Sequence, residues 1–268
     1  MNRTIGIIGA GNMGTAIVRG LVTAAVVAPQ DILATDIDQR RLEAIAADPG
    51  AKTTTHIQTL AAASDVIVLA VKPQSMEGAL RELSRYVKPS HLVISIAAGM
   101  STAYIEKHLG GQTRVVRTMP NTPAMVRAGA TALCRGSQAT EEDMAFATRL
   151  FAALGTTVVV GEDLMDAVTA ISGSGPAYFF YLAEKLAKAG VEQGLSDKDA
   201  AELVRQTFYG SATLLRESGR APEELRARVT SKGGTTAAAV SVFDAASLDS
   251  IISRAVSAAV ARSKELGT

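Results

Sequence analysis

Gly9-Ala10-Gly11-Asn12-Met13-Gly14 is the stretch of sequence that decides the fold of this chain. It follows the apolar run Ile5–Ile8 and precedes a helical pattern, so its three glycines lie at a turn from strand to helix. In such a turn the first glycine allows the tight bend, the second lets a pyrophosphate approach the backbone, and the third permits close packing of helix on strand. The free N–H groups at the helix start then face the pyrophosphate. We therefore predict a dinucleotide-binding turn that comprises Gly9, Ala10, Gly11, Asn12, Met13 and Gly14.

Short β-branched runs and helical patterns alternate through residues 1–161. The expected strands are Thr4–Ile8, Asp31–Thr35, Val66–Ala70, Leu92–Ser95, Arg114–Arg117, Ala130–Leu133 and Thr157–Val160. The expected helices are Met13–Ala24, Asp38–Ala47, Met76–Arg85, Thr102–Lys107 and Glu141–Ala153. This alternation is typical of a mainly parallel sheet with helices on both faces, so we predict an α/β domain over residues 1–161.

The pattern changes after Gly161, because no strand signal follows Asp163 and long Ala- and Leu-rich helical patterns take over. We therefore predict an all-α domain over residues 162–268, although 268 residues also allow one large α/β domain. Segments such as Ala167–Ile171 and Ala177–Leu186 are apolar on more than one face and need cover on every side. We expect contacts between subunits to supply that cover, with the α/β half of the chain as the alternative.

Composition excludes several classes of partner. A net charge of +1 gives no electrostatic footprint for nucleic acid or an anionic membrane. The N-terminus lacks the apolar core of a signal peptide, and no segment reaches transmembrane length without charge. The single cysteine, Cys134, suits a reducing compartment and is expected to pack as a small buried hydrophobe, so we expect a cytoplasmic protein. The histidines His56, His91 and His108 share no ligand spacing, and we expect no metal site.

Asp36 ends the second expected strand, about 20 residues beyond the glycine triplet. An acidic side chain at this place usually binds the adenosine ribose hydroxyls and repels a 2′-phosphate, which favours NADH. Arg40 and Arg41 follow closely and leave NADPH open, although a solvated helix face is the preferred explanation for both arginines.

Two further loops leave the carboxyl ends of expected strands, where open α/β sheets bind their ligands. Ala70, Val71, Lys72 and Pro73 follow one strand, and Asn121 follows another. Prolines fix both backbones. We predict that these residues contribute to the coenzyme site, although each loop taken alone is only a rigid connection.

The segment Thr230–Thr236 places two glycines and two threonines directly ahead of a helical pattern, Ala237–Phe243. Such a junction presents free N–H groups at the positive end of a helix dipole, which suits an anion. The alternative is an ordinary cap, in which Thr235 or Thr236 bonds the helix backbone.

Five motifs occur in order and together resemble pyrroline-5-carboxylate reductase over nearly the whole chain. They are Gly9–Gly14, Val71-Lys72-Pro73, Arg117–Ala124, Ser172-Gly173-Ser174-Gly175-Pro176-Ala177-Tyr178 and Val229–Thr236. The resemblance implies a Rossmann-type N-terminal domain followed by an all-α dimerisation domain, and dimers that often assemble into decamers. It also implies reduction of L-Δ1-pyrroline-5-carboxylate to L-proline with NADPH or NADH, the last step of proline biosynthesis. Members that favour NADPH usually carry a small polar residue in place of Asp36, which leaves coenzyme preference open.

On this resemblance we place the substrate at Val229, Ser231, Gly233, Gly234, Thr235 and Thr236. The N–H groups of Gly233, Gly234 and Thr235 are expected to bind the carboxylate. Thr236 is the expected catalytic residue, with its hydroxyl bonded to the imine nitrogen. An iminium is already electrophilic, so this reduction needs no strong protein acid.

Three other functions stay in view. The β-hydroxyacid dehydrogenases share the two-domain layout but need a lysine soon after the Gly-Ser-Gly turn, and here none precedes Lys185. The second is an imine reductase or amino-acid dehydrogenase that acts on a related cyclic imino acid. Its substrate pocket would differ in size by about one methylene group, which changes the discrimination between substrates by roughly 1–3 kcal/mol. A non-catalytic NAD(P)-binding regulatory protein has little need for a second anion site. Feedback inhibition by proline stays open.

Overall fold

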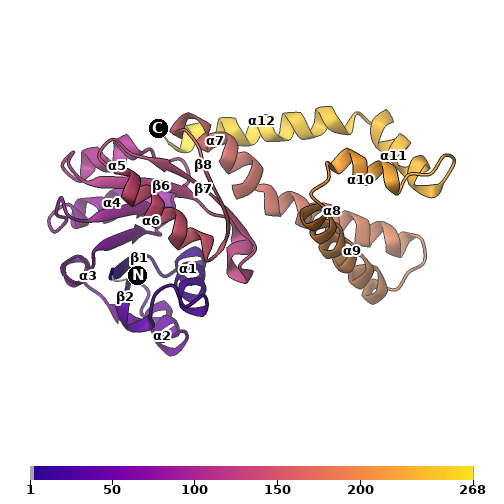
Figure 1. Ribbon diagram of the computed structural model, residues 1–268. Coiled ribbons are helices and arrows are strands. Elements are labelled where there is room, and N and C mark those ends of the chain that lie inside the picture. The colour runs from indigo at the N-terminus through magenta and orange to yellow at the C-terminus, as the bar shows by residue number, and fades with distance from the viewer. Residues whose placement is uncertain (1–2, 268) are drawn as a thin grey trace. The chain divides into compact units, whose positions relative to one another are not determined.

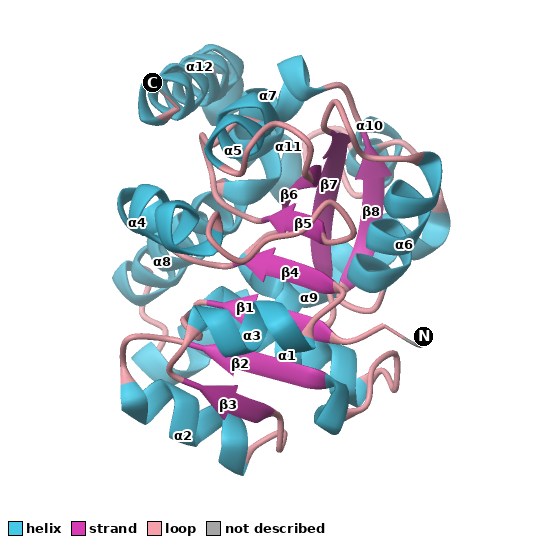
Figure 2. Cartoon of the chain, turned by 90° about the vertical axis from the view of Figure 1, so that its left-hand side faces the viewer, coloured by secondary structure: helices cyan, strands magenta, loops and turns pink. Residues whose placement is uncertain are grey.

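Eight strands form one sheet within residues 3–267, the part of the chain that this computed structural model describes (Figure 1). They are β1 (Ile5–Ile8), β2 (Ile32–Thr35), β3 (Lys52–Thr54), β4 (Val66–Leu69), β5 (Leu92–Ser95), β6 (Arg114–Met119), β7 (Gly129–Arg135) and β8 (Gly155–Val159). Their order across the sheet is β3-β2-β1-β4-β5-β6-β7-β8, as Figure 2 shows. Every neighbouring pair is parallel except β6 and β7, so the predicted mainly parallel sheet is confirmed.

Helices connect most of these strands. They are α1 (Asn12–Thr23), η1 (Pro29–Asp31), α2 (Gln39–Ala47), α3 (Ile57–Ala63), α4 (Pro73–Leu83), α5 (Thr102–His108), η2 (Thr122–Val126) and α6 (Glu141–Ala152). The five helices expected from the sequence are all present within a few residues of their predicted bounds.

Two apolar clusters cover the two faces of the sheet. One contains the α1 residue Ile17, the α2 residue Ile45 and the α6 residue Phe151. The other contains the α3 residue Leu60, the α4 residue Leu80 and the α5 residue Ile105. Each cluster also holds the strand side chains that point to its face, since successive residues of a strand point to opposite faces. Helices therefore lie on both faces, as predicted.

The sequence did not predict β3 or α3. β3 is a three-residue edge strand with no buried side chain, so it lacks the apolar run that reveals the other strands. α3 is seven residues long and is too short to show a helical period.

The second half of the chain is helical among its described residues, as expected. Its elements are η3 (Glu162–Leu164), α7 (Met165–Val168), the π-helical turn η4 (Thr169–Gly173), α8 (Gly175–Glu192), α9 (Asp197–Ser218), α10 (Pro222–Arg228), α11 (Thr235–Ala245) and α12 (Leu248–Leu266). α6 begins with a capping box of Thr140 and Asp143. Ser196 caps α9 by accepting the N–H of Asp199.

The chain divides into two compact units. Residues through Ser174 and from Ala258 onward form the sheet unit, and Gly175–Ser257 forms the helical unit. The predicted domain boundary at residue 161 stays a proposal, because η3, α7 and η4 follow it in sequence and lie within the sheet unit.

The helical unit leaves large apolar side chains exposed. Phe179, Phe180 and Tyr181 of α8 are 62%, 67% and 61% exposed, and Val242 of α11 is 65% exposed. Helices with such faces need a second surface to cover them. Among residues 3–267 no single helix qualifies as a membrane span, while α11 and α12, bent by 55° between them, meet the length and composition requirement only as a pair.

Candidate functional site

The glycine turn after β1 presents unused backbone donors. Gly11 is the N-cap of α1 and supplies no side-chain bond, and the helix's own hydrogen bonding begins with the N–H of Thr15 donating to the Gly11 carbonyl at 2.9 Å. The first-turn N–H groups of Asn12, Met13 and Gly14 therefore have no intrahelical acceptor. The first turn also carries no acidic side chain that would repel an anion.

The three glycines of this turn are required for different reasons. A Cβ on Gly14 would lie 2.0 Å from the Gly9 carbonyl oxygen, and one on Gly9 would lie 2.6 Å from that of Ala70. Packing within the protein therefore demands glycine at both places. A Cβ on Gly11 would have only the Arg41 guanidinium nearby, at 3.9 Å. Because the fold leaves this space open, close approach of a ligand explains Gly11, and the turn fits the pyrophosphate of a dinucleotide.

Asp36 is held in place at the end of β2. One carboxylate oxygen accepts the N–H of Ala10 at 2.6 Å, and the other accepts the N–H of Asp38 at 2.9 Å. Its side chain is only 6% exposed, and the Arg41 guanidinium lies 3.6 Å away. The carboxylate is therefore fixed beside the glycine turn, as ribose recognition requires.

The two arginines that follow Asp36 differ in their surroundings. Arg40 is exposed and bonds Asp38, the N-cap of α2, and this hydrogen bond holds the pKa of the Asp38 carboxyl below its usual range. Arg41 instead lines a cavity of about 310 Å³. The cavity is also lined by Ala10, Gly11, Asn12, Thr15, Ala16, Arg19, Ala44 and Met125. Of the two, only Arg41 is placed to meet a ligand that lies on the glycine turn.

The two other predicted coenzyme loops lie at the same edge of the sheet. Lys72 is the N-cap of α4 and Pro73 its first residue, and no side chain caps this helix. Ala70 and Val71 contact the glycine turn, since a Cβ on Gly9 would meet both their backbones. Asn121 accepts the N–H of Ala130 at 2.8 Å and donates to the Ser172 carbonyl at 3.1 Å. The Asn121 amide thus ties the β6 loop to η4, and its predicted contact with coenzyme stays a proposal.

The Thr230–Thr236 segment forms a glycine turn that opens α11. Gly233 has a φ of +72°, and Gly234 is the N-cap. Because the cap has no side chain, the alternative in which Thr235 or Thr236 caps the helix is wrong. No hydrogen bond joins either threonine hydroxyl to residues 3–267. Thr236 is half-buried and Thr235 is exposed.

The donors of this turn differ in part from those expected. The N–H of Gly234 donates to the Ser231 carbonyl at 3.0 Å, so it is already used within the turn. The helix's own bonding begins with Ala238, which donates to the Gly234 carbonyl at 3.1 Å. The first-turn N–H groups of Thr235, Thr236 and Ala237 therefore have no acceptor within the described residues. An anion at this turn meets donors at the positive end of an eleven-residue helix.

Comparison with known proteins identifies both parts of the chain. Residues 4–99 match the family model for NADP oxidoreductase, coenzyme F420-dependent. Residues 162–266 match the model for pyrroline-5-carboxylate reductase dimerisation. A pyrroline-5-carboxylate reductase of Methanosarcina acetivorans is 41% identical over 99% of this chain and 98% of its own length.

The chain belongs to the pyrroline-5-carboxylate reductase family. The solved reductase of Coxiella burnetii has a TM-score of 0.93 and 38% identity, with 100% of both chains covered. The Plasmodium falciparum pyrroline carboxylate reductase, solved with NADP bound, has a TM-score of 0.90 and 30% identity over 100% of this chain and 99% of that one. The predicted fold, a Rossmann-type domain followed by an all-α dimerisation domain, is confirmed.

Membership in this reductase family also accounts for the exposed apolar helices. The dimerisation model spans α8 to α12, which carry most of the exposed apolar side chains of the described residues. The chain is therefore a subunit of a homo-oligomer.

Two further features concern the cysteine and the potential metal ligands. Cys134 is buried, and burial raises the pKa of its thiol to about 12, so it packs as an apolar side chain as expected. No cluster of three or more potential metal ligands lies within residues 3–267. The sequence singled out no residue of the loop after β5, residues 96–101, because this loop has no proline and Ser101 is its one polar side chain.

The glycine turn gives the first testable prediction. Gly11→Ala adds a methyl group in open space and should leave the thermal midpoint nearly unchanged, while raising the dissociation constant for NADH about 10-fold or more, since the pyrophosphate must approach this backbone. Calorimetry and a coenzyme titration measure the two effects.

Gly14→Ala is the matched variant, because its new methyl group would clash with the Gly9 carbonyl. It should lower the thermal midpoint clearly. An unchanged NADH affinity in Gly11→Ala, or equal loss of stability in both variants, would contradict this division of roles.

Proposed function

We propose that this protein reduces L-Δ1-pyrroline-5-carboxylate to L-proline with NAD(P)H, the last step of proline biosynthesis. The observation that carries the proposal is the glycine turn at Gly233–Thr236, whose N–H groups and two threonine hydroxyls include several donors without a partner among residues 3–267. When bound, NAD(P)H supplies a hydride to the imine carbon, and the nitrogen keeps or takes up a proton from solvent.

The substrate carboxylate binds at the start of α11. The free donors there belong to Gly233, Thr235 and Thr236, while the N–H of Gly234 becomes available only if its bond to Ser231 opens. Ionised acceptors form the stronger class of hydrogen bonds with backbone donors. Val229 is 64% exposed and Ser231 is exposed, so both side chains are free to line the substrate.

Thr236 orients the imine. Its hydroxyl is one helical position beyond Thr235, half-buried and without a partner among the described residues. With the carboxylate on the N–H groups and the nitrogen on this hydroxyl, two polar contacts set the orientation of a small planar ring. Orientation of the reacting carbon toward the hydride then contributes most of the acceleration.

The hydroxyacid alternative lacks a proton-transfer residue. Lys185 is the first lysine after the Gly-Ser-Gly turn, and its ammonium donates to Glu184 at 2.5 Å. This bond raises the pKa of Lys185, which favours the charged ammonium over the neutral amine that a base requires. An imine needs no such base, which supports the reductase.

We propose NADH as the preferred coenzyme. The fixed Asp36 carboxylate is placed to accept the ribose hydroxyls and to repel a 2′-phosphate. Arg41, 3.6 Å from Asp36, offsets part of that repulsion and keeps NADPH as a weaker alternative.

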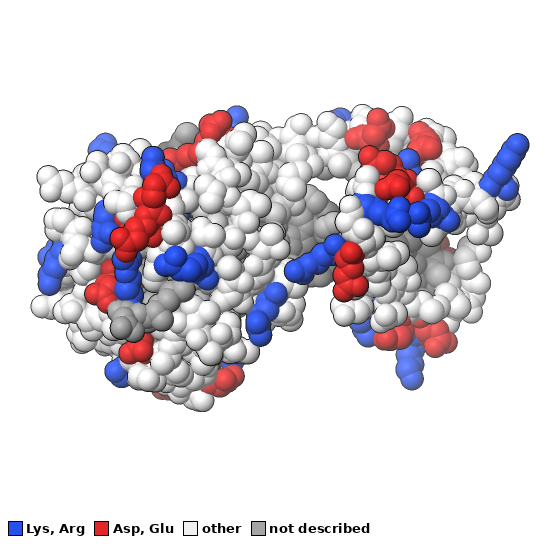
Figure 3. Space-filling view, viewed as in Figure 1, with Lys and Arg blue, Asp and Glu red and all other residues white. Residues whose placement is uncertain are grey.

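We further propose a cytoplasmic homodimer that assembles into a decamer and binds neither nucleic acid nor membrane. The exposed faces of α8 and α11 support the dimer. The buried, lone Cys134 supports a reducing compartment. A net charge of +1, with acidic and basic side chains interspersed on the face shown in Figure 3, supports the absence of a polyanion partner.

The reaction is tested by turnover. The purified chain should oxidise NADH in proportion to added pyrroline-5-carboxylate and form proline. It should prefer this five-membered ring to its six-membered homologue by about 10-fold in kcat/KM, the effect of one methylene in a fitted pocket. Dominant activity on the six-membered ring would favour the related imine reductase, and coenzyme binding without turnover would favour a regulatory protein.

The role of Thr236 is tested against its neighbour. Thr236→Ala should lower kcat/KM about 10-fold or more, since it removes a hydrogen bond to a charged nitrogen. Thr235→Ala keeps the backbone N–H and should change kcat/KM less than about 3-fold. Equal losses in the two variants would argue against a specific role for the Thr236 hydroxyl.

Coenzyme choice is tested at Asp36. Asp36→Ser removes the charge and should shift the ratio of kcat/KM for NADPH over NADH upward by about 10-fold or more, because a 2′-phosphate no longer meets a fixed carboxylate. Asp38→Ser is the matched control, since serine retains the cap of α2 and the Asp38 carboxylate lies 3.7 Å from the Arg41 guanidinium, as that of Asp36 does at 3.6 Å. The same shift in both variants would contradict a specific role for Asp36.

A further inference from the structure

The loop of residues 96–101 joins β5 to α5 at the carboxyl end of β5. In the sheet β5 lies between β4 and β6, so its loop lies between the two predicted coenzyme loops. A dinucleotide bound at the turn after β1 places its adenosine toward β2. Its nicotinamide half therefore extends the other way, toward β4 and β5 and over this loop.

Glu162, shortly after β8, holds the end of the loop. One carboxylate oxygen accepts the N–H of Thr102 at 2.7 Å, and the other accepts the Thr102 hydroxyl at 2.6 Å. Thr102 is buried and is the first residue of α5. Two bonds to an ionised acceptor fix both the backbone and the side chain of this residue.

Arg117 in turn holds Glu162. Its guanidinium donates to the same carboxylate at 3.2 Å, and the Arg117 side chain is only 7% exposed. Arg117 also lies in register with Ser95, the last residue of β5. The loop therefore begins beside Arg117 and ends on the carboxylate that Arg117 binds.

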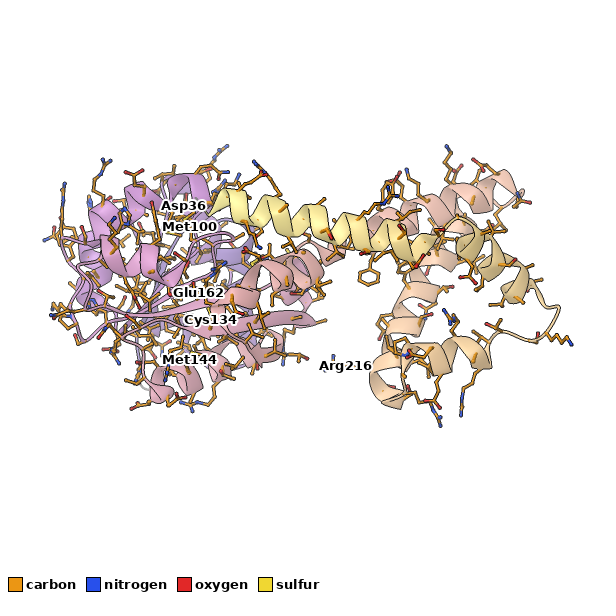
Figure 4. All side chains as sticks on the ribbon, turned by 90° about the horizontal axis from the view of Figure 1, so that it is seen from above. Asp36, Met100, Cys134, Met144, Glu162 and Arg216 are labelled. Atoms are coloured by element: carbon orange, nitrogen blue, oxygen red, sulfur yellow. The ribbon has the colours of Figure 1, made fainter. Side chains whose placement is uncertain are left out.

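The last turn of α12 covers the middle of the loop. Gly99 has a φ of +76°, and a Cβ there would lie 3.0 Å from the backbone carbon of Leu266. A Cβ on Gly267 would lie 2.3 Å from the Gly99 oxygen, so neither backbone has room for a side chain. Ser263 is buried and anchors this turn by donating to Asp166 at 2.6 Å. In Figure 4 the yellow end of α12 lies beside Met100, the neighbour of Gly99.

We propose that Glu162 and the last turn of α12 are positioning elements that hold residues 96–101 in the conformation that contacts the nicotinamide half of the coenzyme. They act through the loop. The inference rests on the proposed function only in its use of NAD(P)H. Three elements distant in sequence (the start of η3, the middle of β6 and the end of α12) converge on this one six-residue connection.

Thr102→Val tests the proposal, because it removes the hydroxyl bond to Glu162 and keeps the backbone bond and the shape. Thr4→Val is its matched control. The N–H and hydroxyl of Thr4 donate to Asp65 at 2.8 and 2.9 Å, just ahead of β1 and at the opposite edge of the sheet. Both variants lose one hydroxyl bond to a carboxylate, and Thr4→Val also loses the bond that this hydroxyl accepts from the N–H of Asp65 at 3.1 Å. Only Thr102 adjoins the proposed coenzyme loop.

We expect Thr102→Val to raise the dissociation constant for NADH about 3- to 10-fold in a titration without imino acid, the factor of one hydrogen bond. Thr4→Val should stay within about 2-fold of the wild type, and Thr102→Ser, which keeps the hydroxyl, should restore binding. Gly267→Ala should also raise the dissociation constant for NADH, as Thr102→Val does. In turnover, the KM for coenzyme should rise while kcat and the KM for imino acid stay nearly constant.

Wild-type NADH affinity in Thr102→Val would overturn the proposal, as would equal weakening in Thr4→Val. The titration needs no reduction of substrate. A chain that shows the expected NADH affinities but reduces no imino acid would therefore contradict the proposed reaction and support this positioning role.

Discussion

Two helices with glycine at the N-cap, α1 and α11, are the constraint on which the proposed chemistry depends. Gly11 is the N-cap of α1 and Gly234 that of α11, and in both cases the glycine leaves the first-turn N–H groups without an acceptor among residues 3–267. Most helices fill this place with serine, threonine, aspartate or asparagine. Where no side chain caps the helix, water or an anion must accept the hydrogen bonds of the first-turn N–H groups. One start suits the pyrophosphate of the coenzyme and the other the carboxylate of the substrate.

The sheet places the other predicted coenzyme residues beside the turn after β1. β1 lies between β2 and β4 in the sheet. The glycine turn after β1 therefore has the Asp36 carboxylate, which follows β2, on one side and the Ala70–Pro73 loop, which follows β4, on the other. Internal packing fixes this arrangement, since Gly9 and Gly14 touch neighbouring backbones that a methyl group would displace. Gly11, by contrast, is open. In this one turn, packing requires glycine at positions 9 and 14, and coenzyme binding is the proposed reason for glycine at position 11.

Much of this was accessible from the sequence, and the exceptions have physical causes. Strand runs such as Val66–Leu69 and the GAGNMG turn are local signals, so they predicted the sheet and the coenzyme turn. β3 was missed because it is short and exposed. The bond from Gly234 to Ser231, which uses one expected carboxylate donor, is a detail of turn geometry that residue types do not specify. The contact of Glu162 with Thr102 joins residues far apart in the chain, and no local pattern predicts such a pair.

The most direct measurement is a crystal structure of the protein with L-proline and oxidised coenzyme. The account predicts the proline carboxylate within hydrogen-bond distance of the N–H groups of Thr235 and Thr236, and the ring nitrogen on the Thr236 hydroxyl. It also predicts the pyrophosphate against the first turn of α1. A carboxylate bound to side chains elsewhere, with the start of α11 occupied only by water, would contradict it.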